Sequence, residues 1–288
     1  MLLTLAYHSI GRSRRAEDVW ALRVSPLNFE SQLNVLNGEC ESADPGSESL
    51  AYLAQSHDLK VLLTFDDGYA DNLHEAVPAL ERYGAAAIVF LASGFIGQPY
   101  FWWDALTRAF WSASDGGVSL DSHTFTALWS FVREQAPAQR RHIMHEFLAL
   151  APLRGVDSEC RPLTKEEVQE LARCKCISFG GHTRSHPWLP FLSQEQMLDE
   201  IVGGMQDNIA LTGREQVAFA YPFGAVNTLA QQAVAEAGFA IAFTTAPPSA
   251  TSNVLTVPRL TVGDWAEVEF RDGLERYKIG LKDAQQRK

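Results

Sequence analysis

Short apolar runs alternate along this chain with segments of helical spacing, and this alternation is the strongest constraint on its fold. The runs are rich in β-branched and aromatic residues and are nearly continuous, which is typical of strands buried on both faces of a parallel sheet. We expect strands to begin near Leu2, Lys60, Ala85, Cys176, Val217, Phe239 and Val254. Because helical patterns separate these runs, the sequence predicts repeated βαβ units and an α/β fold, barrel-like or doubly wound.

Several of the helices have recognisable ends. Ser25-Pro26 pairs an N-cap residue with proline at the first helical position, and Gly38 is expected to close that helix. Thr164 and Ser193 each begin a capping-box pattern.

Residues 98–161 break this alternation of strands and helices, since they contain helical patterns and no convincing strand. This stretch also holds four of the seven tryptophans. We therefore expect residues 1–288 to form a single domain that carries a helical insertion at 98–161.

Composition excludes some classes of protein. The chain has 24 Lys and Arg against 35 Asp and Glu, a net charge of −11, whereas nucleic-acid-binding proteins usually carry a basic excess. No apolar run approaches the ~18 residues that a membrane span needs. The first eight residues are apolar without a basic stretch before them, and the four cysteines suggest no disulfide framework. These features predict a cytoplasmic protein that has no signal peptide and no membrane span and does not bind nucleic acid.

Two groups of polar residues follow predicted strands. Thr64-Phe65-Asp66-Asp67-Gly68 places adjacent carboxylates at a strand end, where α/β folds carry their active sites, although an ordinary Asp-Gly turn would look the same. His182 and His186 follow the strand near Cys176, and the alternative is a pair of surface or capping histidines. Two histidines and one aspartate together form a three-ligand metal set with open positions, in which the second aspartate is free to accept a proton.

With Phe219-Ala220-Tyr221-Pro222-Phe223-Gly224, these stretches resemble the polysaccharide deacetylase family (NodB homology, carbohydrate esterase family 4). The Thr-Phe-Asp-Asp-Gly motif is intact, and His182, Thr183 and His186 match the family's His-Ser/Thr-x-x-His motif. The resemblance implies a distorted (β/α)7 barrel. It implies that Asp66 is the general base, that Asp67, His182 and His186 are metal ligands, and that the Phe223 N–H helps to hold the oxyanion.

The chain departs from the family pattern at two points. Ala220 stands where the family has an arginine that orients the catalytic aspartate, and we expect Arg259 either to supply that charge or to be a plain surface residue. No histidine follows Gly263, where the family commonly has its general acid. A subgroup of the family carries that histidine near the N-terminus in a similar Tyr-His setting, which makes His8 the candidate acid; the alternative is a buried structural histidine.

The implied reaction is removal of an acetyl group from an amino sugar or acetylated glycan, with release of acetate. Zn²⁺ is the expected ion, and Co²⁺, Ni²⁺, Mn²⁺ and Fe²⁺ suit the same ligands. Tyr221, Trp188, Trp102 and Trp103 are the candidate substrate-binding residues, with core packing as the alternative for Trp102 and Trp103.

Three other functions stay open at this point. They are hydrolysis of another amide, for example a formyl group, a catalytically inactive carbohydrate-binding protein, and a metal-dependent oxygenase with two histidines and one carboxylate. Retention of both aspartates and both histidines opposes loss of activity, and the βα alternation opposes the oxygenase.

Overall fold

The fold is built around one parallel sheet. The computed structural model describes residues 1–11, 18–46, 49–53, 59–114, 121–153 and 160–287. The sheet's main path runs β10-β9-β8-β7-β6-β5-β1-β11, with all recorded pairs parallel. Its strands are β1 (Leu2–Tyr7), β5 (Lys60–Asp67), β6 (Ala87–Leu91), β7 (Ile177–Gly181), β8 (Gln216–Ala220), β9 (Ala242–Thr244), β10 (Val257–Pro258) and β11 (Leu260–Thr261).

A single segment brings the two edges of this sheet together. β10 pairs with β9 at one end of the path and β11 pairs with β1 at the other, and only Arg259 separates β10 from β11. The sheet therefore curls into a nearly closed barrel. When β10 and β11 are taken as one strand, the barrel contains seven, which confirms the predicted (β/α) barrel.

All seven predicted strands are present, with later starts for two of them. β9 begins at Ala242 rather than near Phe239, and β10 begins at Val257 rather than near Val254. The short strands β2 (Ser9–Ile10), β3 (Arg23–Val24) and β4 (Glu41–Ser42) were not predicted, because two residues are too few to show a period.

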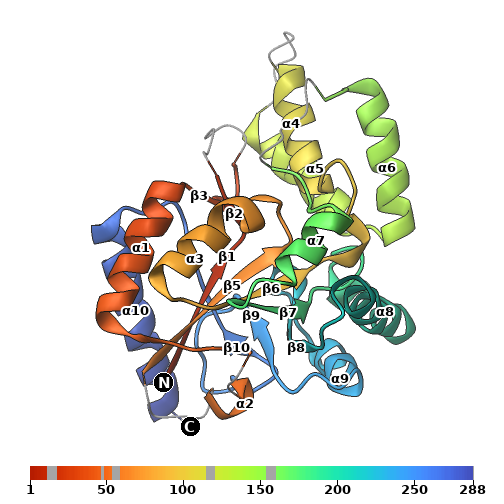
Figure 1. Ribbon diagram of the computed structural model, residues 1–288. Helices are drawn as coiled ribbons and strands as arrows, with labels where there is room; N and C mark the ends of the chain where they lie inside the picture. Colours follow the sequence, from red (N-terminus) through yellow and green to blue (C-terminus); the bar gives the residue numbers. More distant parts are fainter. Residues whose placement is uncertain (12–17, 47–48, 54–58, 115–120, 154–159, 288) are drawn as a thin grey trace.

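Helices surround the barrel, as Figure 1 shows. They are α1 (Pro26–Glu39), α3 (Val77–Tyr83), α7 (Lys165–Leu171), α8 (Gln194–Thr212), α9 (Thr228–Glu236) and α10 (Glu267–Gln286), with the short α2 (Leu50–Leu53). A π-helical turn at Asn72–Ala76 precedes α3, and 3₁₀ turns occur at Ser93–Phe95, Leu189–Phe191 and Pro222–Gly224.

The predicted helix ends agree closely with these bounds. Both capping boxes, at Thr164 and Ser193, are formed. The first helix continues past Gly38 to Glu39.

Both faces of the sheet are buried in separate apolar clusters. Leu2, Leu62, Ile88, Phe90 and Phe243, from four strands, gather with Leu50 and Leu53 of α2 inside the barrel. The alternate residues, such as Leu3 and Leu63, pack outward against the surrounding helices. Burial on both faces explains why the strands are almost continuously apolar.

Three further helices, which we call the helical layer, lie between β6 and α7. They are α4 (Trp102–Ser114), α5 (Ser122–Arg133) and α6 (Pro137–Leu150). In Figure 1 they stand above the barrel, on the side to which the strands lead. The described part of residues 98–161 contains no strand. No helix among the described residues is long and apolar enough to span a membrane.

Candidate active site

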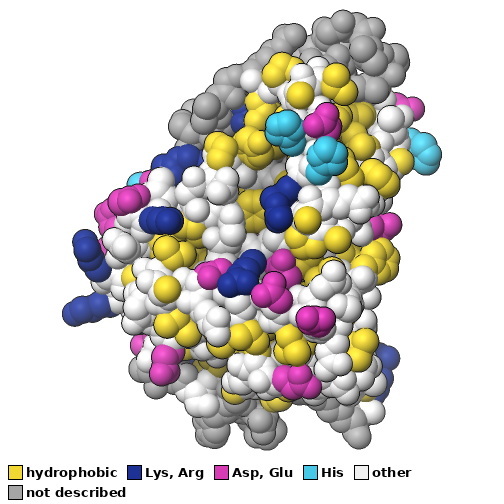
Figure 2. Space-filling model, turned by 90° about the vertical axis from the view of Figure 1, so that its right-hand side faces the viewer, with side chains coloured by type: hydrophobic (Ala, Val, Ile, Leu, Met, Phe, Trp, Pro, Cys, Tyr) yellow, Lys and Arg dark blue, Asp and Glu magenta, His cyan; other side chains and the backbone are white. Residues whose placement is uncertain are grey.

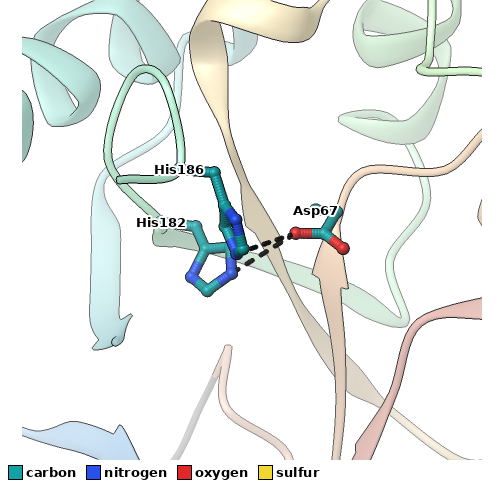
Figure 3. Close-up of side chains that lie close together, drawn as sticks. All are labelled: Asp67, His182 and His186. Carbon is teal, nitrogen blue, oxygen red and sulfur yellow. Dashed lines mark ion pairs between the residues drawn. The ribbon is translucent and has the colours of Figure 1, made fainter. Parts of the chain in front are cut away.

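Three ligand-type side chains meet beyond the carboxyl ends of β5 and β7, which lie on either side of β6. Asp67 ends β5, and His182 and His186 lie in the loop that follows β7. The Oδ1 atom of Asp67 is 3.4 Å from the Nε2 atom of each histidine, and the three ligand atoms lie within 4.8 Å of one another (Figure 3). All three side chains are buried.

The hydrogen bonding of these three side chains leaves acceptor atoms free to bind a cation. The Nδ1–H of His182 donates to the carbonyl of Ala220 at 2.7 Å, which leaves Nε2 as a free acceptor on the side of Asp67. Asp67 Oδ1 is buried and has no hydrogen-bond partner among the described residues. Burial lowers the pKa of His186 well below its usual value and so favours the neutral ring that a metal ligand requires. Two imidazoles and one carboxylate are a set that Zn²⁺ and related divalent ions accept.

Asp66 lies beside this trio in an ion pair with Arg259. Alternation along β5 puts Asp66 on the same face as Leu62, inside the barrel. The two guanidinium Nη atoms of Arg259 donate to the two carboxylate oxygens of Asp66, each at 2.7 Å, and Nη1 also donates to Thr64 Oγ1 at 3.0 Å. Burial alone would raise the pKa of Asp66, but the adjacent guanidinium outweighs it and lowers this pKa to about 2.

Arg259 reaches Asp66 because the barrel closes at that residue. It is only 3% exposed, so it is not a surface arginine. The residue that separates β10 from β11 therefore places its positive charge inside the barrel, beside Asp66. Ala220, which stands where the resembled motif has an arginine, cannot supply this charge.

His8 follows β1 and approaches Asp66 from the neighbouring strand. Its Nε2 atom is 3.9 Å from Asp66 Oδ2, and its side chain is 14% exposed. The carbonyl of His8 accepts a hydrogen bond from Asn72 Nδ2 at 2.7 Å, which ties this strand end to the turn that follows β5.

The backbone at the site is unusual. Five described non-glycine residues have positive φ, and four of them lie here: Asp67 (76°), Thr183 (65°), His186 (52°) and Phe223 (59°). Such conformations are disfavoured for residues with a side chain and persist only where the surroundings impose them. The Phe223 N–H donates none of the backbone hydrogen bonds found among the described residues.

The structure does not bring every predicted substrate-binding residue to an open surface. Tyr221 is fully buried in a cluster with residues of α8 and α9. Trp102 and Trp103 are each 4% exposed and belong to the aromatic cluster of the helical layer, so both rings take part in core packing. Trp188 is half-buried, with the Arg133 guanidinium 3.9 Å from its ring centroid and the Phe223 ring at 5.6 Å.

Two residues at the site were missed by sequence reasoning. Arg140 of α6 and Glu200 of α8 both hydrogen-bond the loop that carries the histidines. Each lies in a charged helical segment that a sequence pattern would assign to solvent, so no sequence signal could have identified them.

The sequence of this chain matches the profile of a known protein family. A profile described as "Polysaccharide deacetylase" matches residues 54–242. The chain belongs to the polysaccharide deacetylase family. The match includes Asp66, Asp67 and both histidines of the trio, whereas His8 and Arg259 lie outside it.

Individual relatives of this family member are distant. YxkH of Bacillus subtilis (strain 168), which carries the description of a polysaccharide deacetylase, is 32% identical over 133 residues. That alignment covers 43% of this chain and 42% of YxkH, so the chain spans less than half of this curated relative.

Solved structures share the fold. The Streptococcus pyogenes deacetylase PplD, solved in complex with acetate, superposes with a TM-score of 0.65 at 19% identity and covers 94% of this chain and 97% of its own. IcaB from Ammonifex degensii gives a TM-score of 0.62 at 17% identity, with 97% of each chain covered.

Proposed function

We propose that this protein is a divalent-metal-dependent deacetylase that hydrolyses the N-acetyl group of an amino sugar or acetylated glycan and releases acetate. One observation carries the proposal: the Asp67–His182–His186 trio, the Asp66–Arg259 pair and His8 lie together at one end of the barrel. Membership of the polysaccharide deacetylase family supports it.

We assign the metal to Asp67 Oδ1, His182 Nε2 and His186 Nε2, with Zn²⁺ as the expected ion. When bound there, a divalent ion supplies Lewis acidity that polarises a carbonyl oxygen and acidifies water. The buried Asp67 Oδ1 has no hydrogen-bond partner within the described part of the chain, which supports this assignment because burying an unpaired carboxylate oxygen is costly.

Asp66 acts as the general base in this proposal. Its carboxylate stays ionised at neutral pH and is held in one orientation by the paired contacts to Arg259. Each oxygen keeps a further lone pair, and Oδ2, which faces His8, accepts the proton of the attacking water.

His8 and Phe223 complete the reaction. In its protonated form His8 delivers a proton from Nε2 to the departing amine, so that a free amino sugar leaves. The Phe223 N–H, which donates none of the backbone hydrogen bonds found among the described residues, donates to the oxygen of the tetrahedral intermediate. Trp188, half-buried beside Phe223, is the residue that we assign to the sugar.

We also propose that residues 1–288 form one domain with an insertion at 98–161 that covers the site. The helical layer adds no described strand to the barrel, and its aromatic cluster includes Tyr69, next to the Asp-Asp-Gly motif, and Phe223.

The proposal is tested by acetate release from N- and O-acetylated glycans and from lipid- or nucleotide-linked acetylated sugars. The enzyme is first stripped with a chelator and then supplied with Zn²⁺. Acetate release that depends on added metal is the expected result. Release of formate would instead favour a deformylase of the same fold, and no release from any substrate would favour a carbohydrate-binding protein without activity.

A further inference from the structure

The two histidines of the proposed metal site are held in different ways. His182 donates its Nδ1–H to the Ala220 carbonyl, whereas His186 Nδ1 is buried and has no hydrogen-bond partner among the described residues. A metal-binding histidine is normally oriented through its second ring nitrogen. Another contact must therefore fix the position of His186.

The ring and the backbone of His186 supply that contact. Its ring packs between Trp103 of α4, at 4.6 Å between centroids, and Phe223, at 4.3 Å. The backbone N–H of His186 donates to Thr183 Oγ1 at 3.1 Å, and its backbone carbonyl accepts from Arg140 Nη1 at 3.3 Å. With a φ of 52°, this backbone conformation depends on such outside contacts.

Arg140 is a buried cation that has no hydrogen-bonded carboxylate among the described residues. It is 3% exposed, and its hydrogen bonds to described residues all go to neutral oxygens: the carbonyls of Ser185 and His186 and, at 3.5 Å, the hydroxyl of Ser185. Burying a guanidinium without a hydrogen-bonded carboxylate is costly, so this placement needs a compensating role. The position of the charge against two successive carbonyls suggests that the role concerns this loop.

Glu200 of α8 binds the same loop with a negative charge, opposite to that of Arg140. Its carboxylate accepts from the N–H groups of Arg184, at 3.1 Å, and Ser185, at 2.8 Å, and from Ser185 Oγ at 2.7 Å. The loop's carbonyls thus face a cation and its N–H groups face an anion, which defines its conformation without any ring hydrogen bond at His186.

We propose that Arg140 is a positioning residue for the metal ligand His186, and that through it the helical layer sets the affinity of the metal site. Arg140 acts through the loop backbone, because its hydrogen bonds go to the carbonyls of Ser185 and His186 and to the Ser185 hydroxyl and none goes to a ligand atom of the described trio. The inference rests on the proposed function only in requiring that the trio binds a divalent ion.

The surroundings of Arg140 make this testable. A cavity of about 760 Å³ between α6 and α8 is lined by Arg140, Arg141, Ser185 and Glu200, among others. Figure 2 shows a hollow on this face with charged side chains around it. A shorter side chain at position 140 would therefore be hydrated rather than leave a sealed void. Arg141 lines the same cavity, is exposed and makes none of the recorded hydrogen bonds to the loop, so it is the matched control.

The experiment compares Arg140→Met, Arg140→Lys and Arg141→Met as metal-free proteins without substrate. Zinc affinity is measured by competition with a chromophoric chelator, and the Co²⁺ absorption spectrum reports the ligand geometry. We expect Arg140→Met to bind zinc about 10–100-fold more weakly and to change the Co²⁺ spectrum, with Arg141→Met close to wild type. Lysine, which cannot hold both carbonyls with a fork, should fall between methionine and wild type.

A folded Arg140→Met protein with wild-type zinc affinity would overturn the inference, even if its urea midpoint falls, because that result describes a purely structural residue. Should the methionine variant not fold, the lysine variant decides: weaker zinc binding supports the inference, and wild-type affinity overturns it. If the wild-type protein binds zinc but releases no acetate, the proposed function is wrong and this inference is unaffected.

Discussion

At the scale of single residues, the two adjacent aspartates are separated by a change in backbone conformation. Asp66 follows the alternation of β5 into the barrel, whereas Asp67, at the strand end with a φ of 76°, faces the two histidines. Neighbouring carboxylates can therefore take different tasks, since one is paired with a guanidinium and the other is left for a cation.

The first prediction concerns this division. Asp66→Asn should reduce acetate release by at least about 100-fold, because asparagine cannot accept the proton, while bound zinc stays at the wild-type level. Asp67→Asn should instead lose zinc. Acetate assays and metal analysis of both variants check this, and loss of zinc from Asp66→Asn would mean that the two roles are exchanged.

The buried pair of Asp66 and Arg259 leads to a second prediction. Arg259→Met should lower the free energy of unfolding by about 3–5 kcal/mol, because it leaves a buried carboxylate unpaired. The double variant Asp66→Asn/Arg259→Met should recover part of that loss. Urea unfolding of the metal-free proteins measures both, and additive effects of the two single changes would show that the pair contributes no coupling energy.

At the scale of elements, helix α7 begins with charged side chains that bind Arg161, in the segment that follows the helical layer in the chain. Glu167 completes the Thr164 capping box and accepts from both Nη atoms of Arg161, each at 2.7 Å. The hydrogen bonds from Arg161 are the main reason why the pKa of Glu167 falls from 4.5 to about 2.

This shift predicts a pH-dependent contribution to stability. Since the pKa is lower in the folded state, Glu167 stabilises the fold fully above about pH 4.5, and the contribution disappears as the pH falls towards 2. Glu167→Gln should therefore be less stable than wild type at pH 7, and the difference should shrink as the pH is lowered below 4.5. Urea midpoints across this range provide the measurement, with Glu166→Gln as the exposed neighbour for control. A difference that does not vary with pH would contradict the assignment.

At the scale of the whole molecule, the candidate site joins three parts of the chain. β5 supplies Asp67, the loop after β7 supplies the histidines, and the helical layer packs on that loop. An ion bound there would link these parts in the folded state only.

Zinc should therefore stabilise the fold. At a free concentration 100 times its dissociation constant, the gain is about 2.7 kcal/mol, which raises the melting temperature by several degrees. Thermal unfolding of the chelator-treated protein with and without zinc tests this, and His182→Ala should abolish the shift. An equal shift in that variant would place the ion elsewhere.

The sequence by itself determined the barrel strands and the two motifs at their ends. Strand positions follow from local apolar runs, and Asp66, Asp67, His182 and His186 each lie directly at or after a strand, where parallel topology must gather them. These features depend on near neighbours in the chain and on strand order, and both can be recognised in a linear sequence.

Only the tertiary structure decided which distant groups complete the site. Arg259 reaches Asp66 across 193 positions because β10 and β11 close the barrel around it. The same packing buries Trp102 and Trp103, which the sequence left open, and brings Arg140 to the histidine loop. These contacts depend on side-chain direction and on how elements pack, and neither leaves a local pattern in the sequence.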